Sequence, residues 1–264
     1  MFEFFRAMKD VQNERDYRNQ EIQKVGIRGI KYPITVLDKE QGYQHTVATV
    51  NMYVDLPRYL KGTHMSRFVE ILNKYRGQIG IKELESILYE MKNKLKAKSA
   101  YIEIKFPYFL EKKAPVTGVK GYMEYLCCFY ASSNHSKIDL CVEVNVPINT
   151  VCPCSKAISR FGAHNQRGVV RLRVKFKKLI WIEDLIRLVE ESVSSDVYTI
   201  LKRPDEKYIT EKSYNNPMFV EDVVREIAIK LKQDPNVTWF SVEAENFESI
   251  HNHNAYAYIE HYNQ

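Results

Sequence analysis

One segment of the chain, residues 149–166, combines cysteine and histidine and shows little hydrophobic periodicity. Cys152 and Cys154 stand on either side of a proline, and His164 follows near the end of the segment. A thiolate and an imidazole together favour zinc or iron over magnesium or calcium, and a catalytic zinc keeps three protein ligands and one open position for water. Because the side chains of an extended Cys-Pro-Cys diverge, we expect only one of the two cysteines to bind a metal ion.

Further residues that could join such a site lie in two later segments. Glu206 falls in Lys-Arg-Pro-Asp-Glu-Lys just after a predicted helix, and Glu248, His251 and His253 fall in the turn between the last two predicted strands. An isolated Glu or His is usually solvated, and we interpret His253 as a surface residue. For the segment around residues 149–166, the plain alternative is a redox-inert cysteine and a surface histidine.

Two predicted helix starts could hold parts of a substrate. His64, Ser66 and Arg67 open the first predicted helix, where free backbone N–H groups and the helix dipole attract anions such as phosphate. The alternative is a plain N-cap, Ser66, followed by a solvated arginine. Glu221 opens a later helix, where an acidic residue can also serve only to complement the helix dipole.

The composition excludes several classes of protein. The chain has 264 residues, 45% of them hydrophobic and 27% charged, which fits one or two globular domains and excludes global disorder. The formal net charge of +6 is small for a protein that coats nucleic acid but sufficient for a phosphorylated small molecule. No apolar run approaches the roughly 18 residues of a membrane span, and the N-terminal Met-Phe-Glu-Phe-Phe-Arg lacks the pattern of a signal peptide. We expect a cytoplasmic protein with neither a membrane nor a nucleic-acid partner.

The five cysteines do not indicate a disulfide framework, because the chain has no secretory features and their number is odd. Cys127 and Cys128 lie in an apolar predicted strand, and Cys141 lies in an alternating one. Free buried cysteine commonly acts as a small hydrophobic residue. We interpret these three as structural.

The order of predicted elements indicates how the candidate residues are positioned. Alternating apolar residues predict strands, and apolar residues at i, i+3, i+4 and i+7 predict helices. The first half gives strands 26–37 and 46–55, helices from the N-cap Ser66 to the stop signal Gly77 and from Ile81 to Leu95, and strands 101–106 and 119–131 separated by a Pro- and Gly-containing connection. The second half gives strands 138–146 and 170–176, helices from Trp181 to about Leu201 and from Val220 to Lys232, and strands 236–247 and 254–261.

Both halves therefore have the order strand, strand, helix, helix, strand, strand, which is an internal duplication of roughly 130 residues. Antiparallel sheets, each with a pair of helices on one face, are the natural packing and predict an α+β fold. We divide the chain into an N-terminal arm, 1–24, a first module, 25–134, and a second module, 135–264, which carries most of the candidate metal site.

Six segments, in order, carry a pattern beyond these single residues. They are Asp-Val-Gln at 10–12, Val-Gly-Ile-Arg-Gly-Ile-Lys-Tyr-Pro-Ile at 25–34, Lys-Gly-Thr-His-Met-Ser-Arg-Phe at 61–68, Cys-Pro-Cys-Ser-Lys at 152–156, Gly-Ala-His-Asn-Gln-Arg at 162–167 and Glu-Ser-Ile-His-Asn-His at 248–253. In this pattern the chain resembles GTP cyclohydrolase I of the type IB family, from about residue 10 to the C-terminus.

The resemblance implies a tunnelling fold, with two copies per chain of a module that has an antiparallel four-stranded sheet and two helices. It also implies a homotetramer with active sites at subunit interfaces, which converts GTP and water to 7,8-dihydroneopterin triphosphate and formate at the entry to folate and pterin pathways. The resemblance implies one divalent metal ion per site, with zinc as the first candidate and manganese or ferrous iron as alternatives. The residues implied are Cys152, His164 and Glu206 as metal ligands, Glu221 as the guanine anchor, and Glu248 and His251 beside the metal.

The reaction explains these residue types. Water must add at C8 of guanine, and a metal ion with an open position lowers the pKa of its water from about 15.7 toward 7. The ring then needs a proton at N7 or N9, for which His251 is the candidate acid and base, with Glu248 orienting it or accepting protons. Glu221 would accept hydrogen bonds from the guanine N1–H and 2-amino group, which adenine cannot offer. The candidates for holding the triphosphate are His64, Ser66, Arg67, Lys156, Arg160 and Lys202.

Three alternatives stay open. A nitrile reductase of the same fold family uses a cysteine nucleophile and a nicotinamide cofactor, and there Cys152 or Cys154 would attack carbon. The basic strand with Arg171, Arg173 and Lys175 could bind RNA in a nonenzymatic module, although a solvated sheet face explains it more simply. The metal could instead be a structural zinc whose fourth position is filled by a protein ligand.

Overall fold

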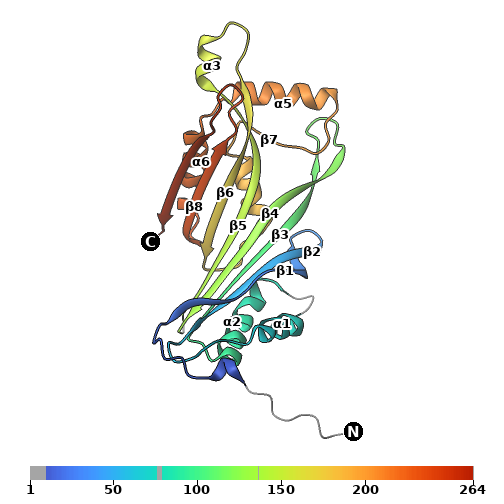
Figure 1. The fold of residues 1–264 in the computed structure, drawn as a ribbon. Helices are drawn as coiled ribbons and strands as arrows, with labels where there is room; N and C mark the ends of the chain where they lie inside the picture. Colours follow the sequence, from blue (N-terminus) through green and yellow to red (C-terminus); the bar gives the residue numbers. More distant parts are fainter. Residues whose placement is uncertain (1–9, 76–78, 136, 264) are drawn as a thin grey trace. The chain divides into compact units, whose positions relative to one another are not determined.

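A computed structural model of the chain describes residues 10–75, 79–135 and 137–263 (Figure 1). The N-terminal Met-Phe-Glu-Phe-Phe-Arg stretch and Gly77, the predicted stop signal of the first helix, lie outside the described residues. No helix in the described part of the chain is long and apolar enough to cross a membrane.

More of the described residues lie in strands than in helices. These strands are β1 (Ile22–Asp38), β2 (Gly42–Leu56), β3 (Ser99–Lys113), β4 (Lys120–Asn134), β5 (Lys137–Val151), β6 (Asn165–Phe176), β7 (Ser195–Asp196), β8 (Val237–Asn246) and β9 (Ala255–Tyr262). Hydrogen-bonded neighbours follow the order β1-β2-β3-β4-β5-β6-β8-β9, and β7 pairs with β5. The pairs β2–β3, β5–β6, β6–β8 and β8–β9 are antiparallel, which confirms the predicted α+β class with an antiparallel sheet.

The helices of the described chain are η1 (Val11–Asn13), α1 (Met65–Lys74), α2 (Ile81–Leu95), α3 (Pro153–Ile158), α4 (Ile182–Glu190), α5 (Arg203–Asn215) and α6 (Val220–Gln233). The bounds predicted for α2 are confirmed, and those for α6 differ by one residue. The prediction of Ser66 as the N-cap of α1 is wrong: His64 occupies that position, so Ser66 lies inside the first turn.

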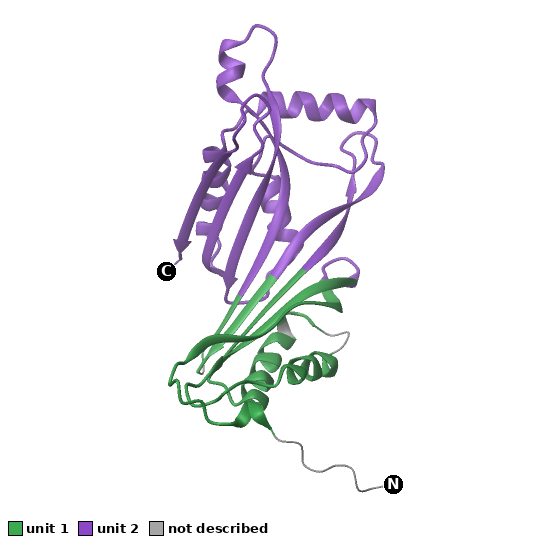
Figure 2. Cartoon of the chain, viewed as in Figure 1, with its two compact units in different colours: residues 1–37, 45–105, 129–140 green, residues 38–44, 106–128, 141–264 purple. Residues whose placement is uncertain are grey.

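The chain forms two compact units, which are coloured separately in Figure 2. Unit 1 comprises residues 1–37, 45–105 and 129–140, and unit 2 comprises residues 38–44, 106–128 and 141–264. Strands β1 to β5 each contribute residues to both units. The division into an arm and two modules at 24/25 and 134/135 follows the repeated element order instead, and it stays a prediction.

The core of unit 1 is built from one side of its strands and the apolar faces of α1 and α2. Met52 of β2 pairs with Ile102 of β3, and both side chains are buried. The helices pack on each other and bury Phe68 of α1 and Leu88 of α2. Full burial of one such side chain contributes roughly 1.5–3 kcal/mol, so the apolar faces read from helical spacing are the faces that hold this unit together.

Unit 2 repeats this arrangement with β5, β6, β8 and β9 and with α4 and α6. Val144 pairs with Leu172, which pairs with Val242, and all three are fully buried. Helix α6 packs on β8, β9 and α4, and it buries Ile227 and Leu231. This packing fixes the start of α6 and the ends of β5, β6 and β8, where the candidate site residues lie.

The arginines of β6 are paired across strands. Arg173 Nε donates to Glu143 at 2.6 Å, and Arg171 Nη1 donates to Glu243 at 2.7 Å. Burial acts to raise the pKa of Glu143, but the hydrogen bonds from Arg173 and Asn145 and the nearby positive charges outweigh it and lower the pKa. These carboxylates offset the positive charge of the strand, so the RNA-binding alternative loses its support.

Two predicted boundaries are wrong because side chains form long-range hydrogen bonds. Residues 107–113, predicted as part of a connection, continue β3, and the hydroxyl of buried Tyr108 donates to Glu183 at 2.7 Å. The helix predicted from Trp181 to about Leu201 ends at Glu190. The serines that follow lie outside the helix, and Ser195 Oγ accepts a hydrogen bond from Asn149 of β5 at 3.0 Å.

Candidate active site

Cys152 lies at the start of a short helix, α3, and not in an extended loop. Its sulfur accepts the N–H of Ser155 at 3.4 Å, and Pro153 suits the first helical position because its missing N–H is not needed there. The prediction of an extended Cys-Pro-Cys is therefore wrong. The two cysteines still differ, since Cys152 is half-buried and Cys154 is exposed. The predicted irregular connection shrinks to residues 159–164.

His164 lies beside Cys152 and is held by a hydrogen-bond relay. The backbone N–H of Cys152 donates to the carbonyl oxygen of His164 at 3.1 Å. His164 Nδ1 donates to Gln166 Oε1 at 2.9 Å, and Gln166 Nε2 in turn donates to Thr150 Oγ1 at 3.1 Å. Ser249 Oγ lies 3.3 Å from the same Nδ1 atom. With Nδ1 engaged, Nε2 is the nitrogen left to bind a metal ion, an arrangement typical of metal-ligating histidines.

A cavity of about 220 Å³ in unit 2 brings three of the predicted residues together: Cys152, Glu221 and Glu248. Phe219 and Tyr256 are among the apolar and aromatic side chains that line the rest of it. The volume is below the roughly 300–1,000 Å³ of a typical ligand pocket. The cavity of a single chain is thus suited to part of a nucleotide, such as the base.

Two buried amides that were not among the predicted site residues, Gln166 and Asn246, line the same cavity. Gln166 stands two residues after His164 at the start of β6, so strand periodicity alone places both side chains on one face. Asn246 ends β8, and its Oδ1 is buried without a hydrogen-bond partner among the described residues. No sequence signal separates Asn246 from the many other asparagines of the chain.

The turn between β8 and β9 carries the remaining predicted residues of this group. Glu248 lines the cavity, whereas His251 does not. His251 and His253 are both exposed, and their rings stack with centroids 5.1 Å apart and planes 19° apart. The structure therefore places His251 on the same turn as Glu248 but outside the cavity of its own chain.

Glu206 is exposed in the first turn of α5, a helix that is not among the predicted elements. The prediction that Glu206 follows a helix is therefore wrong, since it lies inside one. Within the described residues of one chain, no group of three or more His, Cys, Asp and Glu side chains is placed to hold a metal ion. Cys152 and His164 are adjacent, but Glu206 does not complete a three-residue group with them.

The start of α5 is fixed by Asp205, which is buried. Its carboxylate accepts the backbone N–H of Val116, Thr117 and Lys202, each at 2.9 Å, and the Thr117 hydroxyl at 2.7 Å. Burial acts to raise the pKa of Asp205, but these hydrogen bonds outweigh it and hold the pKa well below its usual range. Asp205 therefore stays ionised and anchors the turn that presents Glu206.

An ion-pair cluster holds the other end of α5. Lys112 of β3 and Lys212 of α5 contact the two oxygens of Asp196 at 2.9 and 3.0 Å. Burial acts to raise the pKa of Asp196, but the charge of Lys112 and the hydrogen bonds from Lys112, Tyr198 and Lys212 lower it to about 2 from the ordinary 3.8. The ionised carboxylate thus stabilises the folded state.

Asp196→Asn is expected to lower the free energy of unfolding at pH 7 by about 2 kcal/mol, at 1.36 kcal/mol per unit of pKa. Because the folded-state pKa is the lower one, the contribution is present above about pH 4 and is lost as the pH falls toward about 2. Urea unfolding at pH 7 and pH 3 measures both effects. Glu211→Gln removes an exposed pair on the same helix and should change stability by less than about 0.5 kcal/mol. An equal loss in the two variants would contradict this role.

The first group of phosphate candidates lies in unit 1, at the start of α1. Ser66 is exposed and His64 is partly exposed. Arg67 Nη1 donates to the backbone oxygen of Lys94 at 2.9 Å, near the end of α2. Arg67 thus has a structural contact and is not simply solvated.

The second group of phosphate candidates lies in unit 2. Lys156 Nζ donates to the carbonyl oxygen of Tyr214 at 2.5 Å and lies 4.2 Å from the centroid of that ring, which links α3 to α5. Arg160 and Lys202 are exposed.

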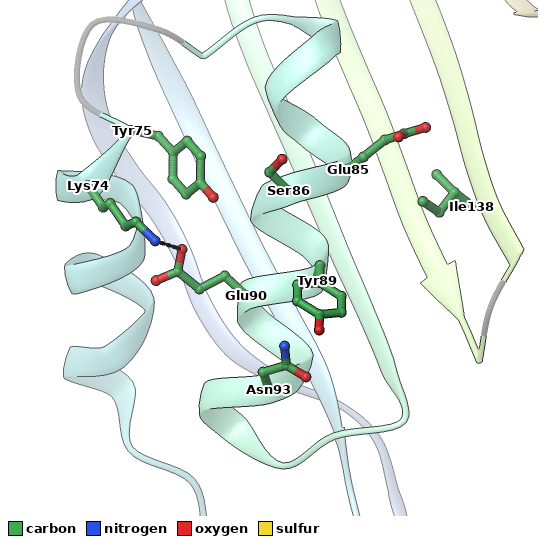
Figure 3. Close-up of a pocket in the computed structure, with 8 residues that line it drawn as sticks. All are labelled: Lys74, Tyr75, Glu85, Ser86, Tyr89, Glu90, Asn93 and Ile138. Atoms are coloured by element: carbon green, nitrogen blue, oxygen red, sulfur yellow. Dashed lines mark hydrogen bonds and ion pairs between the residues drawn. The ribbon is translucent and has the colours of Figure 1, made fainter.

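A larger cavity, about 630 Å³, lies in unit 1 between α1, α2 and Ile138 (Figure 3). Two of its lining charges are paired, since Lys74 Nζ lies 2.8 Å from the carboxylate of Glu90. None of the predicted site residues lines it. We therefore assign the candidate site to the smaller cavity around Cys152.

The antiparallel sheet with its helix pairs defines a tunnelling-fold protein, and solved structures agree. Urate oxidase from Bacillus sp. TB-90 matches with a TM-score of 0.54 and 9% identity, over 91% of this chain and 100% of that one. Uricase from Arthrobacter globiformis matches with a TM-score of 0.50 and 6% identity, over 92% and 93% of the two chains. At such identities the likeness shows the fold alone.

The sequence comparisons are more specific. The family described as "Type I GTP cyclohydrolase folE2" matches residues 8–257. Proteins named GTP cyclohydrolase FolE2 are 60% identical over 96% of this chain and 99% of the relative in Syntrophus aciditrophicus (strain SB), and 61% identical over the same shares in Syntrophobacter fumaroxidans (strain DSM 10017 / MPOB). The chain belongs to the type I GTP cyclohydrolase FolE2 family.

Proposed function

We propose that this chain is a GTP cyclohydrolase I of the type IB kind, which converts GTP and water to 7,8-dihydroneopterin triphosphate and formate. Relatives that carry the name GTP cyclohydrolase FolE2 match it over nearly the whole length. The observation that carries the proposal is one cavity that holds Cys152, Glu221 and Glu248, with His164 hydrogen-bonded to the backbone of Cys152. The product would enter folate and pterin synthesis.

One divalent metal ion per active site is part of the proposal, with zinc first and manganese or ferrous iron as alternatives. Cys152 and His164 suit it, because a thiolate and an imidazole with its second nitrogen engaged are ligands that zinc prefers. Glu206 would be the third ligand. When bound, the ion would supply a hydroxide near neutral pH by lowering the pKa of its water toward about 7.

The third ligand also supports an oligomer. Glu206 does not form a three-residue group with Cys152 and His164 inside one chain. A homotetramer with active sites between subunits would allow a second copy to complete the set. No nucleic-acid or membrane partner is required, and the cytoplasmic location stays a prediction.

Glu221 would recognise the guanine base. It lines the cavity in the first turn of α6, and its carboxylate can accept two hydrogen bonds from N1–H and the 2-amino group. Phe219 and Tyr256 offer the flat apolar contact that a purine ring needs. The proton at N7 or N9 would come from His251, with Glu248 of the same turn orienting it or accepting protons from water.

Glu221→Gln is expected to raise the KM for GTP by about tenfold or more, because hydrogen bonds to a charged group contribute about 1.5–3 kcal/mol. Metal content should stay at the wild-type level, since Glu221 is not a proposed ligand. Steady-state kinetics and metal analysis measure the two quantities. Glu226→Gln, an exposed residue of the same helix, is the matched control. An unchanged KM in Glu221→Gln would remove its proposed role.

The activity itself is tested with the purified full-length chain. It is incubated with GTP and, in separate samples, with zinc, manganese or ferrous ion, and both formate and pterin fluorescence are measured. We expect formate in equal amount to the pterin product with at least one metal ion and none after chelation. Absence of formate with all three ions would contradict the proposed function.

A further inference from the structure

Asn246 is the last residue of β8, a strand of unit 2 with neighbours on both sides. Its backbone pairs with Gly168 of β6 on one side and with Ala255 of β9 on the other. The residue keeps only 2% of its surface exposed, yet it is among those that line the cavity around Cys152. The sheet therefore fixes the place from which this side chain meets the cavity.

The amide of Asn246 has hydrogen-bonding capacity that the described residues do not use. Its Oδ1 is buried and has no hydrogen-bond partner among them. Gln166, the other buried amide of the cavity, differs in this respect, because its Oε1 accepts from His164 and its Nε2 donates to Thr150. The large majority of buried polar side-chain atoms are hydrogen-bonded, so an unused acceptor beside a cavity indicates a ligand that supplies the donor.

Gly168 lets this amide lie close to β6. A Cβ atom on Gly168 would lie 2.6 Å from Asn246 Oδ1 and also 2.6 Å from the backbone oxygen of Glu245, so two acceptor oxygens border the same small space. A half-turn about the last side-chain torsion of Asn246 exchanges Oδ1 and Nδ2 at little cost. It would bring a donor to the side of the Glu245 oxygen and free Oδ1 to face the cavity.

The donors of guanine indicate which hydrogen this acceptor can take. The base has one N–H hydrogen on N1 and two on the 2-amino group. In the proposed binding mode, the carboxylate of Glu221 accepts N1–H and the nearer amino hydrogen. The second amino hydrogen, on the side of N3, is then the N–H of the base that still needs an acceptor. Because the cavity of about 220 Å³ suits the base rather than the ribose or the phosphates, a donor of the base is the expected partner.

We propose that Asn246 is a specificity-determining residue, whose Oδ1 accepts the second 2-amino hydrogen of the guanine base held by Glu221. This inference rests on the proposed function for the identity of the base. The ligand class that it requires is a 2-aminopurine nucleotide with a free amino hydrogen on the N3 side. Glu221 and Asn246 together bind all the N–H groups of the base, so a substituent on the N3 side of the amino group leaves a buried acceptor unpaired.

The test uses N2-methyl-GTP, in which a methyl group replaces one amino hydrogen. The remaining hydrogen stays beside N1–H for Glu221, which places the methyl group on the side of Asn246. The kcat/KM for formate release is measured for GTP and for N2-methyl-GTP, with the wild-type full-length chain and with Asn246→Ala. We expect the wild-type chain to prefer GTP by about tenfold or more, because the methyl group removes the donor and contacts the amide.

Asn246→Ala is expected to lower the kcat/KM for GTP by about three- to tenfold, the range for loss of one neutral hydrogen bond. Its preference for GTP over N2-methyl-GTP should fall below about threefold, because the shorter side chain leaves room for the methyl group. A merely structural role would lower both kcat/KM values alike and leave the preference at the wild-type level. Asn246→Ser also shortens the side chain but keeps a hydroxyl for nearby backbone groups, so it provides the same comparison if Asn246→Ala does not fold.

Asn254→Ala is the matched control. Asn254 is an exposed asparagine of the turn between β8 and β9, and its Nδ2 donates to the carboxylate of Glu245 at 2.7 Å. This variant should keep the wild-type preference for GTP. Three results would each overturn the inference: an equal loss of preference in Asn254→Ala, equal use of the two nucleotides by the wild-type chain, and an unchanged preference in Asn246→Ala.

Failure of the inference and failure of the proposed function give different results. Formate release with a preference that does not depend on Asn246 upholds the cyclohydrolase reaction and overturns the role of Asn246. If the wild-type chain releases no formate with any metal ion, the reaction is contradicted, and Kd values for the two nucleotides, measured by calorimetry, replace kcat/KM. A preference in Kd that depends on Asn246 then upholds the role of this residue, whereas no binding of either nucleotide overturns it.

Discussion

Cys152→Ala is expected to remove the bound metal ion and, with it, formate release from GTP. Cys152 is the one proposed sulfur ligand, and His164 is fixed next to it by a backbone hydrogen bond of 3.1 Å. Loss of an outer partner already weakens metal binding by about 10- to 100-fold, so loss of the thiolate itself should exceed that range. Metal content after dialysis and formate production measure the effect, and circular dichroism checks that the chain stays folded.

Cys154→Ala is the matched control, because Cys154 lies in the same short helix but is exposed. It should keep both the metal ion and turnover. Wild-type metal content in Cys152→Ala would contradict the ligand assignment. Lost turnover with the metal ion retained would favour the alternative in which Cys152 is a nucleophile, as in the nitrile reductase of the same fold family.

His251→Ala is expected to keep its metal ion and to lower kcat by about 10²- to 10⁴-fold, the usual contribution of a general acid or base. His251 is exposed on the turn that also carries Glu248, which lines the cavity around Cys152. Single-turnover formate release, measured from pH 6 to pH 9, follows the proton-transfer step. The neighbouring Glu248 would keep a small part of the activity.

His253→Ala is the comparison, since the ring of His253 stacks on His251 at 5.1 Å. It should lower kcat by less than about tenfold, because loss of a ring contact removes no proton donor. A larger loss in His253→Ala than in His251→Ala would assign proton transfer to His253. A wild-type rate in His251→Ala would require another donor.

The sequence predicts helices and strands well where apolar residues are regularly spaced and the face that they form is buried. Val142, Val144 and Val146 alternate with polar residues and are all buried in β5. Helix α2 begins and ends where the apolar spacing predicts, because its buried face is also its apolar face. In both cases local propensity and tertiary packing favour the same structure.

Apolar spacing does not predict helices that bury few apolar side chains. Helix α5 buries only Asp205 and Ser213, so it has no apolar face to read. Its start is nevertheless marked by Pro204 and the acidic residue that follows, both common in a first turn. Helix α3 has six residues, too few for a period to appear. Such elements depend on long-range hydrogen bonds that a single sequence does not display.

The residues of the candidate site, like the helices and strands, can be predicted from the sequence only in part. Residue type suggests Cys152 and His164, and the family resemblance adds Glu221. The structure brings Cys152 and Glu221 to one cavity, with His164 beside Cys152. Gln166 follows from strand periodicity once His164 is chosen. Asp10 and His64 lie before and after the first strand pair in sequence, and only the folded chain shows that Asp10 Oδ1 lies 3.2 Å from His64 Nε2.

The X-ray absorption spectrum of the zinc-loaded, full-length chain tests the metal centre most directly. We predict one sulfur ligand at about 2.3 Å together with nitrogen and oxygen ligands at about 2.0–2.2 Å, one of them water. In Cys152→Ala the sulfur signal should disappear, whereas in Cys154→Ala it should remain. A spectrum with two sulfur ligands, or with none, would contradict the proposed set of Cys152, His164 and Glu206 around an open position.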